Sequence, residues 1–401
     1  MLEGKKIIVG VSGGIAAYKA PMLVRLLVKA GAEVRCVATA HALEFVTRLT
    51  LETVSNNRLY CDLFESANDR STEHISLKDW GDMMVVAPAT ANVIGKLANG
   101  IADDALSTLL LAFRKPLTVC PAMNCEMLEC PAVQRNIAYL QQEGVDVMQP
   151  DSGELACGAV GKGRMPEPEE IVRHLEQMAH PHRGQLEGRR ILVTAGPTYE
   201  RIDAVRFVGN FSTGKMGFAL AEELAMRGAE VTLVSGPTHL ETFHPGIRRI
   251  DVESAQQMFD AATGSWPESH AAILSAAVAD FRPEHAADIK IKKQNDTDGM
   301  TIAMVQTPDI LATLGRNKQP HQRLVGFALE TNNEMEHAKR KLERKNLDFI
   351  VLNSLQDPGA GFGHNTNRVT IIDRTGRVDQ GSLKSKQAVA FDIADKLFEI
   401  L

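Results

Sequence analysis

A buried strand followed by a helix occurs twice in the chain, once in each half. In the first half, Lys6–Val11 is a candidate buried strand, residues 12–14 form a glycine turn, and residues 16–30 have helical periodicity. In the second half, Arg190–Ala195 is a similar strand, and residues 215–227 have helical periodicity. This order is typical of parallel sheets whose strands are joined by helices. The sequence therefore predicts two α/β domains.

Further apolar runs extend both halves of the pattern and predict additional buried strands. They lie at residues 33–38, 83–87 and 117–120 in the first half, and at residues 230–235, 271–275 and 349–352 in the second. We expect two doubly wound, Rossmann-like domains with largely parallel sheets, over residues 1–188 and 189–401. The polar stretch 179–188 is the predicted linker. Residues 151–166 are rich in glycine, lack apolar periodicity and predict a mobile loop.

Length and composition agree with a globular protein of two domains. The chain has 401 residues, of which 44% are hydrophobic and 23% charged. Its net charge of −6 argues against nucleic-acid or anionic-membrane partners, and no apolar run reaches the ~20 residues that span a bilayer. All six cysteines precede position 158, so a disulfide framework is not indicated. We expect reduced thiols and a cytoplasmic location.

Several motifs of the first half follow predicted strands. The turn S-G-G at 12–14 lies where backbone N–H groups and a helix dipole favour a phosphate, although glycines required only for turn geometry explain it equally well. It is not G-x-G-x-x-G, so a dinucleotide is not indicated. The small residues A-P-A-T-A-N at 87–92 suit a flat ring or a tight turn. Cys120, Cys125 and Cys130 are not spaced like zinc ligands.

Together with H-I at 74–75, P-A-M-N at 121–124 and A-C-G at 156–158, these motifs resemble the flavin-dependent cysteine decarboxylases. Within them, the first half is most similar to the phosphopantothenoylcysteine decarboxylases of coenzyme A synthesis. The resemblance implies a flavodoxin-like flavoprotein domain. It also implies that His74 is the base of an oxidative step, that Asn124 holds the substrate carboxylate and that Cys157 donates a proton. The implied FMN-binding residues are Ser12, Gly13, Thr39, Pro88, Ala89 and Thr90.

A flavin makes chemical sense for such a reaction. The carboxylate to be lost lies on the α-carbon of an N-acylated cysteine, which has no electron sink. Oxidation of the thiol to a thioaldehyde creates one, and a flavin can accept the hydride. Carbon dioxide then leaves, and return of the hydride with a proton completes the reaction.

The second half has motifs that exclude two common nucleotide-binding folds. F-S-T-G-K-M-G at 211–217 opens a helix but lacks the upstream glycine of a phosphate loop, which argues against an ordinary nucleoside triphosphatase. No tyrosine has a lysine four residues later, which argues against a short-chain reductase. A-A-V-A-D-F at 276–281 delivers a carboxylate at a strand end, where it could hold a ribose or magnesium. K-I-K-K at 290–293 is either a cationic site or a solvated loop.

With T-P-D-I at 307–310 and V-G-F-A-L-E-T at 325–331, this set resembles the phosphopantothenate–cysteine ligases, from about residue 189 onward. The resemblance implies CTP and Mg²⁺, with an acyl-cytidylate attacked by cysteine; the metal ligands are not implied. Lys290 would stabilise the transferred phosphate, Asn210 would hold the acyl intermediate, and Arg206 would lie near the substrate phosphate. The implied CTP-binding residues are Ser275, Ala276, Asp280, Lys290, Pro308, Asp309, Ile310, Phe327, Lys341 and Lys345.

The two resemblances imply one bifunctional enzyme acting on small molecules. The ligase would join 4′-phosphopantothenate to cysteine, and the decarboxylase would convert the product to 4′-phosphopantetheine. A redox protein with an unrelated nucleotide-binding tail would leave His74, Asn124 and Cys157 unexplained, and a regulatory subunit would have lost them. The resemblance also implies a homo-oligomer, with trimeric decarboxylase and dimeric ligase contacts that together would build a dodecamer. Residue types alone do not distinguish CTP from ATP.

Overall fold

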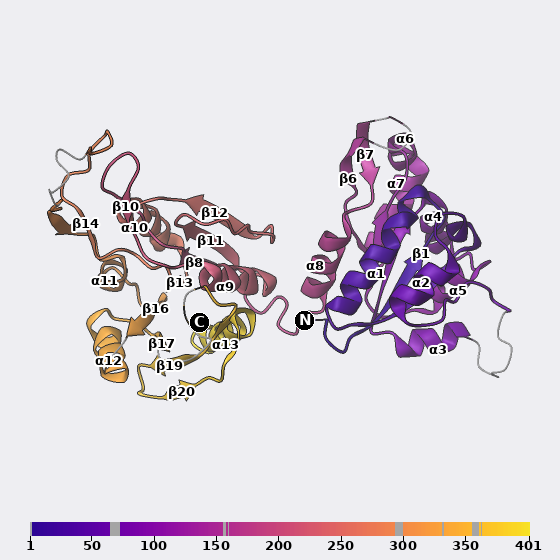
Figure 1. Ribbon diagram of the computed structural model, residues 1–401. Helices are drawn as coiled ribbons and strands as arrows, with labels where there is room; N and C mark the ends of the chain where they lie inside the picture. Colours follow the sequence, from indigo (N-terminus) through magenta and orange to yellow (C-terminus); the bar gives the residue numbers. More distant parts are fainter. Residues whose placement is uncertain are drawn as a thin grey trace. The chain divides into compact units, whose positions relative to one another are not determined.

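The computed structural model describes residues 2–64, 73–154, 158, 160–292, 300–330, 333–354, 361 and 363–401. The chain divides into two units, Met1–His180 and Pro181–Leu401 (Figure 1). Cys157, Lys293 and Thr331, named above in motifs, lie outside the described residues. Among those that are described, no helix is long and apolar enough to cross a membrane.

The first unit is built on a parallel sheet with the strand order β2-β1-β3-β4-β5. This is the flavodoxin-like order, in which ligands bind at the carboxyl ends of the strands where the order reverses, here between β1 and β3. The predicted strands are present, and the third and fourth extend two residues and one residue further than expected. Their bounds are β1 Lys6–Val11, β2 Glu33–Ala38, β3 Met83–Ala89, β4 Leu117–Pro121 and β5 Asp146–Val147.

Helices cover both faces of this sheet (Figure 1). The helix predicted over 16–30 is a 3₁₀ turn, η1, followed by the α-helix α1, because Pro21 lacks the N–H group that would continue one helix through its first turn. The remaining helices follow the strands as expected. The bounds are η1 Ile15–Lys19, α1 Ala20–Lys29, η2 Ala40–Glu44, α2 Arg48–Ser55, α3 Glu73–Trp80, α4 Ala91–Asn99, α5 Ala105–Ala112, α6 Cys125–Glu129, α7 Pro131–Gln142 and α8 Pro168–Met178.

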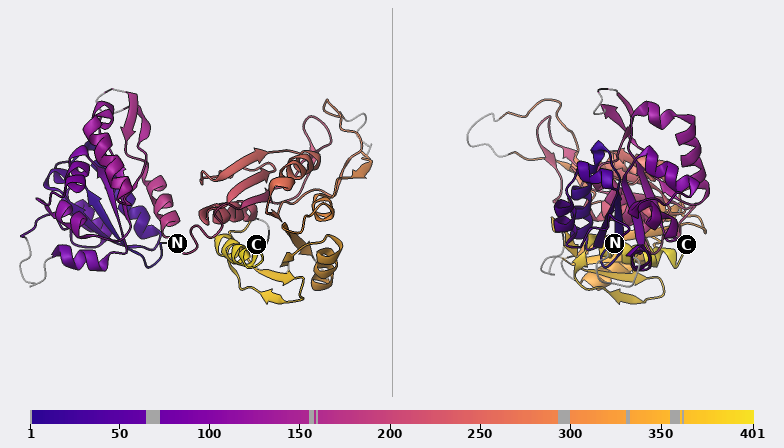
Figure 2. Two further views of the ribbon diagram at one scale, coloured as in Figure 1. Left: turned by 180° about the vertical axis from the view of Figure 1, so that it is seen from behind. Right: turned by 90° about the vertical axis from the view of Figure 1, so that its right-hand side faces the viewer.

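The glycine-rich stretch 151–166 contains an antiparallel hairpin of β6 (Asp151–Glu154) and β7 (Val160–Arg164). The sequence predicted a loop here, and the structure instead forms two short strands over these residues. Gly153 pairs with Gly161 across the ladder, so backbone hydrogen bonds rather than alternating apolar side chains define the strands. The hairpin lies beside α6 at one end of the unit (Figures 1 and 2).

The second unit has a mixed sheet with the order β12-β11-β8-β13-β16-β17-β19-β20. From β12 to β17 the strands are parallel and follow the Rossmann order, whereas β19 and β20 run antiparallel. The order reverses between β8 and β13. The bounds are β8 Arg190–Ala195, β11 Glu230–Ser235, β12 Ile247–Asp251, β13 Ala271–Leu274, β16 Arg323–Glu330, β17 Phe349–Ser354, β19 Val369–Asp373 and β20 Val378–Gln380.

Short strands form separate pairs outside this sheet. The strands β14 and β15 belong to an arm that projects from the sheet in Figure 1 and in Figure 2. The bounds are β9 Glu200–Arg201, β10 Phe207–Val208, β14 Phe281–Pro283, β15 Met304–Gln306, β18 Thr366–Asn367 and β21 Lys384–Ser385.

Two layers of helices enclose the second sheet. The helices α9 (Lys215–Met226) and α13 (Lys386–Phe398) share one core with it, and α10 (Ala255–Ser265), α11 (Ile310–Arg316) and α12 (Glu334–Arg344) share the other. A 3₁₀ turn, η3 (Trp266–Glu268), follows α10. The helix α9 packs closely on the sheet, since a Cβ on Gly217 would stand 2.5 Å from Cβ of Ala195 and 2.7 Å from Oγ of Ser275.

Residues 181–188, within the predicted linker, belong to the second unit. Leu186 is 1% exposed and lies in the α9 and α13 core. The side chain of Gln185 accepts a hydrogen bond of 2.9 Å from Arg227, which is fully buried. Residues 181–188 therefore pack with the second unit, which the sequence did not indicate because one apolar residue among polar ones gives no periodic signal.

Candidate functional site

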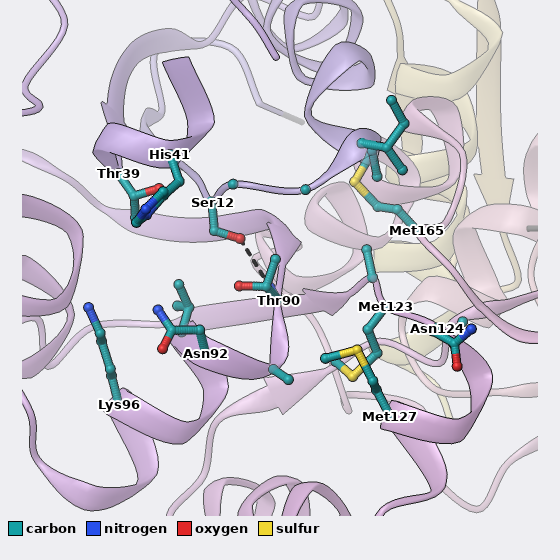
Figure 3. Close-up of a pocket in the computed structure, with 18 of the residues that line it drawn as sticks. Ser12, Thr39, His41, Thr90, Asn92, Lys96, Met123, Asn124, Met127 and Met165 are labelled. Atoms are coloured by element: carbon teal, nitrogen blue, oxygen red, sulfur yellow. Dashed lines mark hydrogen bonds between the residues drawn. The ribbon is translucent and has the colours of Figure 1, made fainter. Parts of the chain in front are cut away.

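A pocket of about 1270 Å³ lies at the carboxyl ends of β1 and β3 in the first unit (Figure 3). Its walls come from η1, η2, the start of α4, the loop before α6 and the end of β7. Typical small-molecule pockets measure about 300–1,000 Å³, so this one has room for a cofactor together with a substrate.

Ser12 joins the turn after β1 to the turn after β3. Its hydroxyl donates to the carbonyl oxygen of Pro88 at 2.8 Å and accepts from the backbone N–H of Thr90 at 3.0 Å (Figure 3). Ala89 is fully buried and, in the described chain, neither it nor Pro88 lines the pocket. Ser12 and Thr90 therefore form the pocket wall, and Pro88 and Ala89 support it from behind.

Gly13 brings the first turn against η2. A Cβ at this position would stand 2.4 Å from Cβ of His41, so only glycine permits the approach. The hydroxyl of Thr39 accepts a hydrogen bond from the N–H of Ala42 and begins η2. Gly13 and Thr39 both line the pocket. Small residues, hydroxyl groups and a turn that precedes a helix are features that suit a phosphate and a flat ring.

Asn124 lies toward the other end of the pocket, near Met123, Met127 and Met165 (Figure 3). Its side-chain oxygen accepts a hydrogen bond of 2.8 Å from the N–H of Glu126 and begins α6. The side chain of Asn124 is thereby fixed at the start of α6, beside the methionine side chains of the pocket wall.

The pocket wall includes a charged cluster that sequence reasoning missed. Nζ of Lys96 lies 2.5 Å from Asp103 and 2.7 Å from Asp104. Burial alone would lower the pKa of Lys96, but the two carboxylates outweigh it and raise that pKa above its ordinary value. The sequence I-A-D-D at 101–104 indicates a helix cap but not an ion pair, since the partner Lys96 lies on another helix, α4.

Among the predicted catalytic residues, His74 lies away from this pocket, and Cys157 is not among the residues that the structure describes. Within the described part of the chain, His74 does not line it. His74 lies in the first turn of α3, at the opposite end of the unit from α6 in Figure 1. Cys157 lies outside the described residues, between β6 and β7.

In the second unit, three predicted residues meet where β8 and β13 end. The hydroxyl of Ser275 donates to the carbonyl oxygen of Thr194 at 2.8 Å, and the N–H of Ala276 donates to the Thr194 hydroxyl at 3.2 Å. The carboxamide of Asn210 donates to the carbonyl oxygen of Ala277 at 2.6 Å. They therefore gather at the point where the strand order reverses.

A second group lies at the ends of β16, α11 and α12. Asp309 begins α11 and pairs with Lys345 at 2.8 Å, while Nζ of Lys341 donates to the carbonyl oxygen of Phe327 at 2.8 Å. Burial alone would raise the pKa of Asp309, but hydrogen bonds from Lys345 and a backbone N–H outweigh it and hold that pKa below its usual value. Pro308 precedes Asp309, and Ile310 is buried in the core, which leaves its backbone as the part able to meet a ligand.

Arg206 and Lys290 lie on neighbouring segments connected by Asp203. The buried carboxylate of Asp203 accepts from Nε of Arg206 at 2.9 Å and from the N–H of Ile291 at 3.1 Å. Arg206 also donates to the carbonyl oxygen of Ile291 at 3.0 Å. Lys290, next to Ile291 in the chain, is exposed. Asp280 is also exposed, and its carbonyl oxygen accepts a hydrogen bond from the backbone N–H of Thr307. Sequence reasoning missed Asp203, although its position three residues before Arg206 indicates a capped turn.

No metal centre is indicated in the described part of the chain. No group of three or more His, Cys, Asp or Glu side chains is placed there to hold an ion. Cys120 is buried, and burial raises the pKa of its thiol, whereas Cys130 is exposed.

Comparison with known proteins places both units in families. Residues 1–180 match the family described as Flavoprotein, and residues 186–401 match the DNA/pantothenate metabolism flavoprotein C-terminal domain. The coenzyme A biosynthesis bifunctional protein CoaBC of Bacillus subtilis is 47% identical over 398 residues, which are 99% of this chain and 97% of that protein. The chain belongs to the CoaBC family. The predictions of two α/β units and of this family are confirmed.

Other relatives cover most of the chain as well. The CoaBC protein of Vibrio parahaemolyticus is 45% identical over 400 residues, 100% of this chain and 99% of that protein. A cysteine/cysteine sulfinic acid decarboxylase from an unknown prokaryotic organism is 49% identical over 359 residues, 89% of this chain and 99% of that protein.

Proposed function

We propose that the chain catalyses two successive steps of coenzyme A synthesis. Its second unit would ligate 4′-phosphopantothenate with cysteine through an acyl-cytidylate, using CTP, and its first unit would decarboxylate the product to 4′-phosphopantetheine, using FMN. The observation that carries the proposal is the pocket between β1 and β3, which joins the Ser12–Thr90 wall to the Asn124 carboxamide. Similarity to CoaBC proteins over the whole chain supports the pairing of the two activities.

In the first unit, Ser12, Gly13, Thr39 and Thr90 would hold FMN, with Pro88 and Ala89 behind them. When bound, the flavin supplies a hydride acceptor and donor. The carboxamide of Asn124 would bind the substrate carboxylate, and the neighbouring methionines would exclude water. Cys157 would donate the final proton.

In the second unit, the polar groups around Ser275, Asp309 and Phe327 would bind CTP. Lys341 on α12 and Lys345 directly after it would neutralise the charge of its phosphates. A carboxylate acylates an amine only after its oxygen has become part of a leaving group, which transfer of a nucleotidyl group would achieve. Lys290 would stabilise the phosphate during this transfer. Mg²⁺ would neutralise the phosphates. Asn210 would hold the acyl intermediate and Arg206 would lie near the substrate phosphate.

The position of His74 supports a homo-oligomer, in which a neighbouring copy would bring His74 to this pocket. Ile15 and Tyr18 line the pocket and are 57% and 62% exposed, as expected of a pocket wall completed by another copy. We propose a trimer through the first unit, a dimer through residues 212–217 of the second, and a cytoplasmic location.

The function is tested with the purified protein, phosphopantothenate, cysteine and either CTP or ATP. We expect pyrophosphate with CTP, followed by carbon dioxide. A parallel reaction with free cysteine, the substrate class named for one relative, should release no carbon dioxide, because cysteine lacks the phosphopantothenoyl group whose contacts with the pocket would position the carboxylate. Carbon dioxide from cysteine alone would favour a cysteine decarboxylase.

Substitution of Lys290 tests the ligase assignment. We predict that Lys290→Gln abolishes acyl-cytidylate formation, since the transferred phosphate loses its cation, and leaves decarboxylation of added phosphopantothenoylcysteine unchanged. Pyrophosphate release is the measurement, and release at the wild-type rate would remove Lys290 from the mechanism.

Substitution of Cys157 tests the decarboxylase assignment. We predict that Cys157→Ser releases carbon dioxide but stalls before the final reduction, because the proton donor is absent. Mass spectrometry of the product checks this. A saturated amine formed at the normal rate would show that another group supplies the proton.

A further inference from the structure

The hairpin strand β7 touches the loop that carries Asn124 at a single glycine. The N–H of Met123 donates to the carbonyl oxygen of Gly163 at 3.0 Å. A Cβ on Gly163 would stand 2.2 Å from the carbonyl oxygen of Met123, whereas real Cβ contacts are not shorter than 3.0 Å. The φ angle of Gly163 is +149°, which side chains rarely adopt. The two backbones therefore meet at a distance that only glycine allows.

The chain after Gly163 is held in place independently. Nζ of Lys19, on η1, lies 2.7 Å from the carboxylate of Glu167 and 3.4 Å from the carbonyl oxygen of Met165. The Lys19 side chain is only 10% exposed, whereas the Glu167 side chain, which it anchors, is 46% exposed. Displacement caused by a side chain at Gly163 would consequently act on Met123 as well as on β7.

Asn124 follows Met123 directly and receives any such displacement. Met123, Asn124 and Met165 line the pocket (Figure 3). Gly163 lines it as well. Since the Asn124 carboxamide begins α6 through Glu126, its place in the wall depends on the position of the Met123 peptide. Relief of the Gly163 clash requires a shift of about 1 Å, and a shift of that size can cost about a hundredfold in rate.

We infer that Gly163 is a positioning residue for the decarboxylation. Its lack of a side chain sets the position of the Met123 peptide and, through it, the Asn124 carboxamide. The inference rests on the proposed function, in which Asn124 binds the substrate carboxylate.

The test compares Gly163→Ala with Gly144→Ala in the full chain. Gly144 also has a positive φ angle, +85°, but a Cβ there would meet nothing within 4 Å. We expect Gly163→Ala to lower kcat/KM for phosphopantothenoylcysteine at least tenfold, chiefly through KM, and Gly144→Ala to leave it unchanged. Both variants should keep the flavin absorbance, and pyrophosphate release by the second unit should match the wild type.

A double-mutant cycle with Asn124→Ala separates positioning from general damage. If Gly163 acts through Asn124, then Gly163→Ala should cost less than about twofold in the Asn124→Ala background. Equal effects in both backgrounds, a wild-type kcat/KM for Gly163→Ala, or loss of the flavin absorbance would each overturn the inference. Failure of the wild type to release carbon dioxide would instead contradict the proposed function.

Discussion

The carboxylate of Asp203 lies buried between β9 and β10 and accepts hydrogen bonds from Arg206 and from the N–H groups of Val205 and Ile291. The hydrogen bond from Arg206 is the main cause that holds the pKa of Asp203 well below its usual range, against the opposing effect of burial. A carboxylate with a lowered pKa stabilises the fold above its ordinary pKa, about 3.9, and this contribution is lost as the pH falls below that value.

Asp203→Asn should therefore lower the urea midpoint of the second unit at pH 7. The difference from the wild type should stay constant down to about pH 4 and shrink below it, because the wild-type carboxylate then loses its advantage. Urea titrations of the fragment 181–401, which contains Trp266 but not Trp80, followed by tryptophan fluorescence, measure it. A difference independent of pH would mean that the charge of Asp203 contributes nothing.

The site residues that the sequence indicated differ from those it did not in how far along the chain their interaction partners lie. Ser12 and Asn124 were found because each belongs to a short motif at a strand end. Lys96 and Asp203 were missed because their roles depend on other segments, the loop before α5 and the segment of Ile291. A local sequence pattern cannot show an interaction between distant segments of the chain, whereas the folded structure does.

Among the elements, α5 depends on an N-terminal cap that also neutralises a lysine. Asp104 accepts from the N–H of Ser107 at 2.8 Å and from Lys96 at 2.7 Å. Asp104→Ala should lower the free energy of unfolding of the first unit by about 1–2 kcal/mol through loss of the cap. Thermal unfolding followed by Trp80, which lies in this unit, measures it. Asp103→Ala, at a more exposed partner of Lys96, should cost less; an equal cost would assign the effect to the lysine pair.

Regular strands were predictable, and the hairpin was not. The strands β1, β2, β8 and β11 begin and end where the apolar runs do, because a strand buried on both faces needs apolar residues at successive positions. The hairpin of β6 and β7 lacks that signal, since its ladder pairs Gly153 with Gly161 and otherwise carries mostly polar side chains.

At the scale of the whole molecule, most of the segment between the two sheets, residues 181–188, packs with the second unit. Leu186 is buried beside α9 and α13, and Gln185 binds the buried Arg227. A fragment that begins at residue 189, the predicted domain boundary, should therefore be less stable than one that begins at residue 181. Loss of the buried leucine alone should cost about 1.5–3 kcal/mol. Urea midpoints of the two fragments provide the measurement, and equal midpoints would show that residues 181–188 do not contribute.

The approach of α9 to the second sheet has a genetic consequence. Gly217 leaves no space for a Cβ against Ala195 and Ser275. Every single-base change of a glycine codon that alters the amino acid adds a side chain. The side chain of Ala195 is a single methyl group, so its loss is the only reduction possible at that position. A compensating change would have to remove both that methyl group and the hydroxyl of Ser275, which connects the ends of β8 and β13. Random mutation at this codon can therefore escape selection only when it is silent, so the codon should vary at its third base alone.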